Sequence, residues 1–133
     1  MELMKSKHAV YRIAYHIVFC TKYRNKVLVG PIEVECRRII GETCYKYNWK
    51  LLNIEVMPDH VHLLIQTDHT TAPYNIVQNI KSISAVYLFE KFPSLKRNKF
   101  WGSGLWSPSA FYGSVGNVSE KVIQNYINNQ HSS

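Results

Sequence analysis

The strongest indication of the fold is the stretch Pro58-Asp59-His60-Val61-His62-Leu63-Leu64-Ile65-Gln66. Read as a β-strand, it directs successive side chains to opposite faces of a sheet. The face that reads as core carries Val61, Leu63 and Ile65. The opposite face carries His60, His62 and Gln66, with Leu64 among them. Two imidazoles about 6.6 Å apart along a strand can converge on one metal ion, or they are two exposed residues of a half-buried strand.

Hydrophobic periodicity divides the rest of the chain into strands and helices. Strands are predicted over 11–20, 49–57 and 60–67, with a further strand beginning at Leu105-Trp106. Helices are predicted over 31–47, from Ile76 to just before Pro93, and over about 118–130. A glycine-punctuated connector from Ser107 to Gly116 precedes the terminal helix. This order predicts an α+β sandwich with helices on one face of a mainly antiparallel sheet.

Composition restricts the class of protein. With 133 residues, 46% hydrophobic and 19% charged, the chain suits one domain with a buried core and is neither disordered nor fibrous. A net charge of +7 favours a polyanionic partner, with nucleic acid first and an anionic membrane surface second. Without a signal-peptide or membrane-spanning run, a cytoplasmic protein is expected. Cys20, Cys36 and Cys44 lack metal-site spacing and are expected to be reduced core thiols.

A basic cluster with an aromatic residue inside it follows the first predicted strand. It consists of Lys22, Tyr23, Arg24 and Lys26. Lysine and arginine can hold phosphates while tyrosine stacks on a base, which makes these residues candidate nucleic-acid contacts. The alternative is a solvated loop, which the excess of positive charge disfavours. A second basic patch is formed by Lys96, Arg97 and Lys99.

The terminal helix carries two polar residues on an otherwise apolar stripe. Tyr126 and Gln130 lie one turn apart, on the same stripe as Ile123 and Ile127. Such a stripe is more often plain core packing, but a core gains little from glutamine, and a buried tyrosine hydroxyl needs a partner. If this helix covers the face with both imidazoles, the amide oxygen completes a mixed site for Mg²⁺ or Mn²⁺. The phenol is then a nucleophile that could attack a phosphodiester polarised by the ion.

These motifs, in this order, resemble the HUH single-tyrosine transposases of small insertion sequences that move as single-stranded DNA, the IS200-like transposases. HUH stands for His, hydrophobic residue, His. The residues that carry the resemblance are 58–64 and 126–130, together with 15–19, 21–24, 105–109 and 114–119. The resemblance covers roughly residues 8 to 130. One departure is Ala110-Phe111-Tyr112, where the aromatic residue is expected one place earlier.

The resemblance implies a single catalytic domain over 1–133 with a ferredoxin-like, RRM-like fold, acting as a homodimer. It implies that His60, His62 and Gln130 bind Mg²⁺ or Mn²⁺. It makes Tyr126 the nucleophile that cuts and rejoins single-stranded DNA at insertion-sequence ends through a 5′-phosphotyrosine intermediate. DNA hairpins are the implied partner, in a cytoplasmic protein that joins the nucleoid when bound to DNA and needs no membrane. In this family the tyrosine helix of one subunit can complete the site of the other, an exchange that the connector suits.

Other functions stay open at this point. A non-catalytic nucleic-acid-binding module would use the many aromatic residues to stack bases and would form no covalent product. A domesticated relative that acts on repeated palindromes would have the same site. A replication initiator or relaxase is disfavoured by the short chain. A purely structural protein, with His60 and His62 merely exposed, ranks last.

Overall fold

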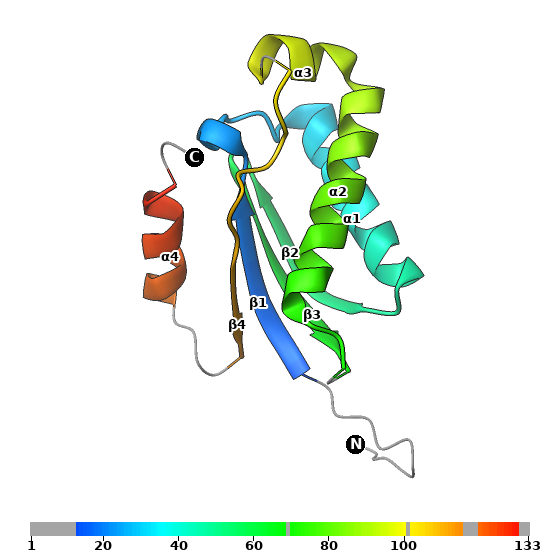
Figure 1. Cartoon of the computed structure of the whole chain (residues 1–133), viewed down its shortest axis with the longest axis vertical. Coiled ribbons are helices and arrows are strands. Elements are labelled where there is room, and N and C mark those ends of the chain that lie inside the picture. The colour runs from blue at the N-terminus through cyan, green and yellow to red at the C-terminus, as the bar shows by residue number, and fades with distance from the viewer. Residues whose placement is uncertain (1–12, 69, 101, 116–119, 131–133) are drawn as a thin grey trace.

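The computed structural model describes residues 13–68, 70–100, 102–115 and 120–130. Its centre is a four-stranded antiparallel sheet in the order β2-β3-β1-β4 (Figure 1). The strands are β1 (Ile13–Cys20), β2 (Lys50–Met57), β3 (His60–Thr67) and β4 (Phe111–Ser114). The helices are α1 (Gly30–Lys46), α2 (Pro73–Lys91), α3 (Pro93–Lys99) and α4 (Glu120–Asn128), with a short 3₁₀ helix at Lys22–Arg24. The predicted α+β class with an antiparallel sheet is confirmed.

Strand β3 lies in the interior of the sheet, between β2 and β1. The predicted alternation along it is confirmed, because Val61, Leu63 and Ile65 are completely buried while His60 and His62 are partly exposed. The β2–β3 hairpin turns at Pro58-Asp59, as the sequence indicates. An apolar residue at every second position buries one face of the strand and leaves the other for polar groups.

Helices α1 and α2 cover one face of the sheet and form the main core with it (Figure 1). Ile40 of α1 and Ile80 of α2 are fully buried in the same cluster as Phe19 of β1. The predicted core cysteines are free and buried. Burial raises the pKa of the Cys36 and Cys44 thiols to about 12, so both stay protonated at neutral pH. None of the helices in the described ranges is long and apolar enough to cross a bilayer.

Helix α4 lies on the other side of the sheet, away from α1 and α2 (Figure 1). Its Ile123 and Ile127 form a second, smaller cluster with Val18 of β1, against which Phe111 and Tyr126 pack. Val18 points away from the main core because its neighbours Ile17 and Phe19 point into it. The helix bears the apolar stripe predicted for it but ends at Asn128, so Gln130 lies beyond it; residues 118 and 119, where it was expected to begin, lie outside the described ranges.

The sequence prediction is wrong about the last strand and misses helix α3. Trp106 forms only an isolated bridge with Thr21, and β4 lies at Phe111–Ser114, inside the predicted connector. The Trp106 side chain is taken up by the core, where its Nε1 atom donates a hydrogen bond to Ser84 Oγ at 3.0 Å. Strand β4 has four residues at the edge of the sheet, too few for its alternation to be recognised.

Candidate active site

The two imidazoles of β3 lie on the face of the sheet that α4 covers. Val18 is the cross-strand partner of His62, so both side chains stand on the same face as near neighbours. Val18 in turn contacts Ile123 and Ile127 of α4. The structure therefore brings the terminal helix to the histidine face within one chain.

His60 is oriented by the residue before it. Its Nδ1 atom lies 2.9 Å from Asp59 Oδ1, and the Asp59 side chain is only 7% exposed. A carboxylate on one ring nitrogen is the usual support of a metal-binding histidine, because it sets the ring orientation and leaves the other nitrogen for the ion. For His60 the nitrogen left for an ion is Nε2.

The Asp59 carboxylate is ionised and contacts both His60 and Arg24. Burial by itself raises its pKa, but hydrogen bonds from His60 and Arg24 outweigh burial and hold the pKa below its usual range. Both contacts to Arg24 end on Oδ2, from Nε and from Nη2, each at 2.9 Å. Asp59 thus joins the first imidazole of the motif to a guanidinium from another part of the chain.

His62 has a neighbour that the sequence analysis did not assign. His62 Nε2 lies 3.1 Å from His16 Nδ1 on β1, so one ring must donate a proton and the other accept it. On the other side, His62 Nδ1 lies 3.8 Å from Glu55 Oε1, on the paired strand β2. His16 is therefore a functional candidate that sequence reasoning missed. The sequence feature that could have identified it is the alternation of strand β1, which directs the His16 side chain away from the core.

Tyr126 and Gln130 share one hydrogen-bonding partner, Ser109. Ser109 Oγ donates to Gln130 Oε1 at 3.0 Å and lies 3.0 Å from the Tyr126 hydroxyl. In the contact between Ser109 and Tyr126, either hydroxyl can be the donor. Ser109 ends the 105–109 stretch that carries the family resemblance, but the sequence analysis assigned it no role in the site.

The Tyr126 phenol is a neutral group in this setting. Burial of the side chain raises its pKa, and the hydrogen bond with Ser109, which acts in the opposite direction, does not cancel the effect. Its ring packs beside Phe111 of β4, with ring centroids 5.9 Å apart. Tyr126 therefore stays protonated at neutral pH and needs activation before it can act as a nucleophile.

Helix α2 holds the segment that carries Ser109. Lys81 Nζ donates to the Ser107 and Ser109 carbonyl oxygens, each at 2.8 Å. Burial lowers the pKa of Lys81 to about 8, and the two carbonyl acceptors compensate part of the lost hydration of its ammonium group. The position of Ser109 under Tyr126 thus depends on the opposite layer of the fold.

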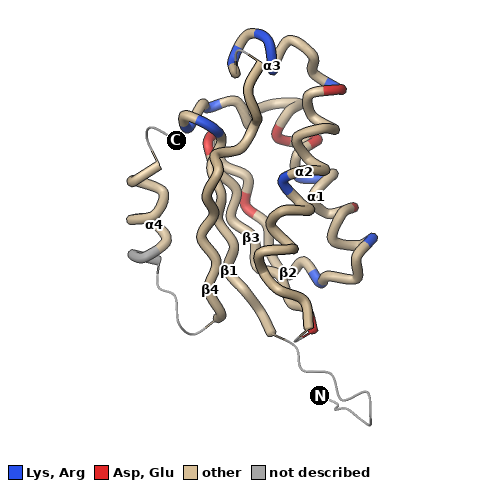
Figure 2. The backbone as a smooth tube through the Cα atoms, in the orientation of Figure 1, with Lys and Arg blue, Asp and Glu red and all other residues tan. Residues whose placement is uncertain are grey.

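The four candidate nucleic-acid contacts lie in and beside the 3₁₀ helix that follows β1. Tyr23 and Lys26 are exposed, and Lys22 Nζ stands 5.7 Å from the centre of the Tyr23 ring. Arg24 is turned inward to Asp59. Figure 2 shows this turn at the same end of the molecule as α3, which carries the second basic patch.

The donor set fits an ion held by nitrogen and oxygen atoms. In the ranges that the structure describes, no three His, Cys, Asp or Glu side chains are grouped to hold a metal. Among the described residues, the proposed third ligand beside His60 and His62 is of another type, the amide oxygen of Gln130, which here accepts a hydrogen bond from Ser109. To bind the ion, His62 would give up its contact with His16 or Glu55, and Gln130 would give up its hydrogen bond from Ser109.

We expect the Asp59→Asn variant to lose a contribution to stability that the wild type has at neutral pH but not in acid. The folded-state pKa of Asp59 is lower than its usual value near 3.8, so its contribution is complete above about pH 4 and disappears as the pH falls through the lower folded-state value. At pH 6 the free energy of unfolding of the variant should be lower than that of the wild type by about 1.5–3 kcal/mol, the range for hydrogen bonds to charged groups. Urea unfolding from pH 6 down to pH 2 measures this difference, which should shrink at acid pH. A constant difference would contradict the assignment.

Comparison with known proteins adds independent observations. Residues 9–130 match the family model described as "Transposase IS200 like". The ISDra2 transposase TnpA of Deinococcus radiodurans is 37% identical over 131 residues, 98% of this chain and 93% of the relative. The transposase for insertion sequence element IS200 of Salmonella typhimurium is 29% identical over 123 residues, 92% of this chain and 80% of the relative.

Two solved structures have the same fold. A putative transposase from Deinococcus radiodurans superimposes with a TM-score of 0.88 and 35% identity, over 98% of this chain and 100% of that one. A REP-associated tyrosine transposase bound to a REP hairpin superimposes with a TM-score of 0.57 over 95% of this chain and 69% of that one. At 13% identity, the second likeness concerns the fold alone.

Proposed function

The chain belongs to the IS200-like transposase family, and we propose that it cleaves and rejoins single-stranded DNA at insertion-sequence ends through a 5′-phosphotyrosine intermediate. The observation that supports this reaction most directly is the meeting of α4 with the histidine face of the sheet. Helix α4, which carries Tyr126, packs through Ile123 and Ile127 on Val18, and Val18 is the cross-strand partner of His62.

His60, His62 and Gln130 would hold a divalent ion, Mg²⁺ or Mn²⁺. When bound, such an ion withdraws charge from the scissile phosphate and stabilises the negative charge that develops during attack. Asp59 holds the His60 ring, and Gln130 follows directly after the helix that carries Tyr126 and shares its partner Ser109. Nitrogen and oxygen donors of this kind suit Mg²⁺ and Mn²⁺.

Tyr126 would attack the phosphate with its hydroxyl oxygen. The attack forms a bond between Tyr126 Oη and the 5′-phosphate, breaks the bond to the 3′ oxygen and leaves a free 3′-OH, which gains a proton. The phenol loses its proton; in the resting site its hydroxyl is hydrogen-bonded to Ser109 Oγ. The tyrosine ester conserves the energy of the phosphodiester, so a 3′-OH can reverse the step and join strands without ATP.

Single-stranded DNA with hairpins is the proposed partner. Support comes from the net charge of +7 and from the basic residues that gather at one end of the molecule, in α3 and in the turn after β1 (Figure 2). The exposed Tyr23 ring can stack on a base beside these charges. We further propose a homodimer, in which α4 completes the site of its own subunit or that of its partner.

A covalent adduct with DNA tests this function. The protein is incubated with Mn²⁺ or Mg²⁺ and single-stranded oligonucleotides copied from the DNA that flanks its gene. Trypsin then releases residues 122–133 as one peptide, whose only tyrosine is Tyr126. We expect a nucleotide attached to this peptide by mass spectrometry, and only when the divalent ion is present. Metal-dependent binding without any covalent product would favour the non-catalytic nucleic-acid-binding module instead.

A further inference from the structure

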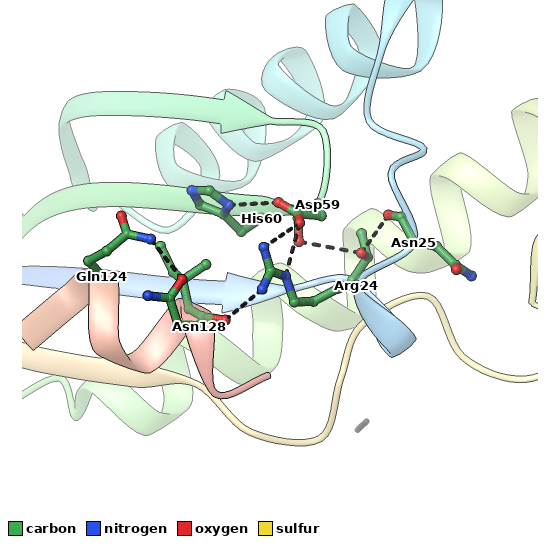
Figure 3. Close-up of polar contacts among 8 residues, drawn as sticks. Arg24, Asn25, Asp59, His60, Gln124 and Asn128 are labelled. Atoms are coloured by element: carbon green, nitrogen blue, oxygen red, sulfur yellow. Dashed lines mark hydrogen bonds and ion pairs between the residues drawn. The ribbon is translucent and has the colours of Figure 1, made fainter. Parts of the chain in front are cut away.

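Arg24 lies between helix α4 and the first histidine of the motif (Figure 3). Its Nε and Nη2 atoms contact Asp59 Oδ2, each at 2.9 Å, and its Nη1 atom donates to the Ile127 carbonyl oxygen at 3.2 Å. Asp59 Oδ1 in turn contacts His60 Nδ1. A continuous polar chain therefore runs from the backbone of the terminal helix through Arg24 and Asp59 to His60.

Arg24 supplies a positive charge at the C-terminal end of α4. Ile127 is in the last turn of α4, where the helix dipole is negative, and its carbonyl oxygen accepts from the Gln130 backbone N–H at 3.1 Å as well as from Arg24. The last turn of α4 contains no basic residue of its own. Arg24, from an early part of the chain, thus caps the helix that carries Tyr126 and ends two residues before Gln130.

The turn that positions Arg24 has a strained backbone, which hydrogen bonds of Thr21 stabilise. Tyr23 and Arg24 have φ values of 61° and 52°, in the left-handed region that costs a non-glycine residue about 1–3 kcal/mol. Buried Thr21 holds the turn, because its backbone N–H donates to the Asp59 carbonyl oxygen at 3.0 Å and its hydroxyl donates to the Asn25 carbonyl oxygen at 2.7 Å. Backbone strain of this kind persists where the surrounding contacts outweigh it, which points to a role for the side chain that the turn positions.

We propose that Arg24 is a positioning residue, which couples the docking of helix α4 to the orientation of His60. The proposal rests on the proposed function and deepens it, because it concerns how the same site is assembled. Arg24 was predicted from the sequence as a nucleic-acid contact. Its side chain is only 24% exposed, and three of its nitrogen atoms already contact Asp59 or α4, whereas Tyr23 and Lys26 are exposed.

Hydrogen exchange in the absence of metal and DNA tests the contact with the helix. In Arg24→Gln, the amides of α4 should exchange roughly tenfold faster than in the wild type, the loss expected for one charge-assisted hydrogen bond. Lys22→Gln is the matched control, since it removes one positive charge from the same turn and leaves the contact with Ile127 intact. Amides of β3 serve as an internal reference, so that a variant that is unstable throughout is recognised.

The Asp59→Asn variant tests whether the carboxylate is part of the same chain of contacts. It should also accelerate exchange in α4, because Asp59 holds the guanidinium in place. The double variant should exchange no faster than Arg24→Gln alone, since both changes break one connection. Unchanged exchange of α4 in Arg24→Gln, or fully additive effects in the double variant, would overturn the proposal.

Binding of Mn²⁺ alone, measured by electron paramagnetic resonance, tests the connection with His60. Arg24→Gln should weaken Mn²⁺ binding by about tenfold, the lower end of the range for residues that support a metal ligand, and Lys22→Gln should not. Equal affinities in wild type and Arg24→Gln would overturn the coupling. If the wild type binds no Mn²⁺, the proposed function fails, whereas the metal-free exchange experiments still decide the role of Arg24.

Discussion

Replacing Tyr126 by phenylalanine is expected to abolish the covalent DNA adduct and to lower strand cleavage by at least roughly a thousandfold, because no other group of the protein is proposed to attack the phosphate. The phenylalanine ring keeps the packing against Phe111, and only the hydrogen bond between the tyrosine hydroxyl and Ser109 is removed. Losing that contact should cost no more than about 1 kcal/mol of unfolding free energy. The measurement is the adduct band after denaturing electrophoresis, with end-labelled oligonucleotide.

Tyr45→Phe is the matched control for this experiment. Tyr45 is near the end of α1 and 88% exposed, on the layer of the fold opposite α4. The same single oxygen atom is removed there, so adduct formation should continue at the wild-type rate. A Tyr126→Phe protein that still becomes linked to DNA would show that another residue is the nucleophile.

The His62→Ala variant should lower metal-dependent cleavage by at least roughly a hundredfold and weaken Mn²⁺ binding in parallel. Its imidazole is a proposed ligand, and the remaining donors, His60 and Gln130, would leave the ion with an incomplete site. The substitution also leaves His16 without the ring 3.1 Å from its Nδ1 atom. Cleavage rates across a Mn²⁺ titration separate a weaker affinity from a lower maximal rate.

Glu55→Gln controls for the change of charge beside His62. The Glu55 carboxylate lies 3.8 Å from His62 Nδ1, but its side chain is 58% exposed. An ion pair this exposed contributes little, so cleavage should stay within about threefold of the wild type. Undiminished metal-dependent cleavage by His62→Ala would remove His62 from the site, and a loss in Glu55→Gln as large as that in His62→Ala would point to the carboxylate instead.

The two histidines could be placed on one face from the sequence because strand geometry is local. A period of two along 60–67 separates the imidazoles from Val61, Leu63 and Ile65 whatever the rest of the fold does. The stripe of the terminal helix follows in the same way from a period of 3.6. Each pattern repeats over enough residues for a single sequence to reveal it.

The connector could not be predicted because its structure depends on distant partners. Trp106 bonds with Ser84, and Lys81 holds the carbonyl groups of Ser107 and Ser109, so contacts with α2 decide the path of this segment. Ser109 comes to lie under Tyr126 only as a result. A four-residue edge strand is too short for its alternation to be recognised, and no spacing along the chain relates Ser109 to Tyr126.

Which side chains share a strand face or a helix stripe can be read from the sequence alone, because backbone geometry repeats every 2 residues in a strand and every 3.6 in a helix. The sequence also determined the family, through motifs in a fixed order. The tertiary structure alone decided which faces meet: β1 beside β3, which brings His16 to His62, and the Thr21–Asn25 turn beside the end of α4, which turns Arg24 toward Asp59 and Ile127. Such contacts join residues up to 103 positions apart, and they follow from how the sheet and helices pack together rather than from any local pattern.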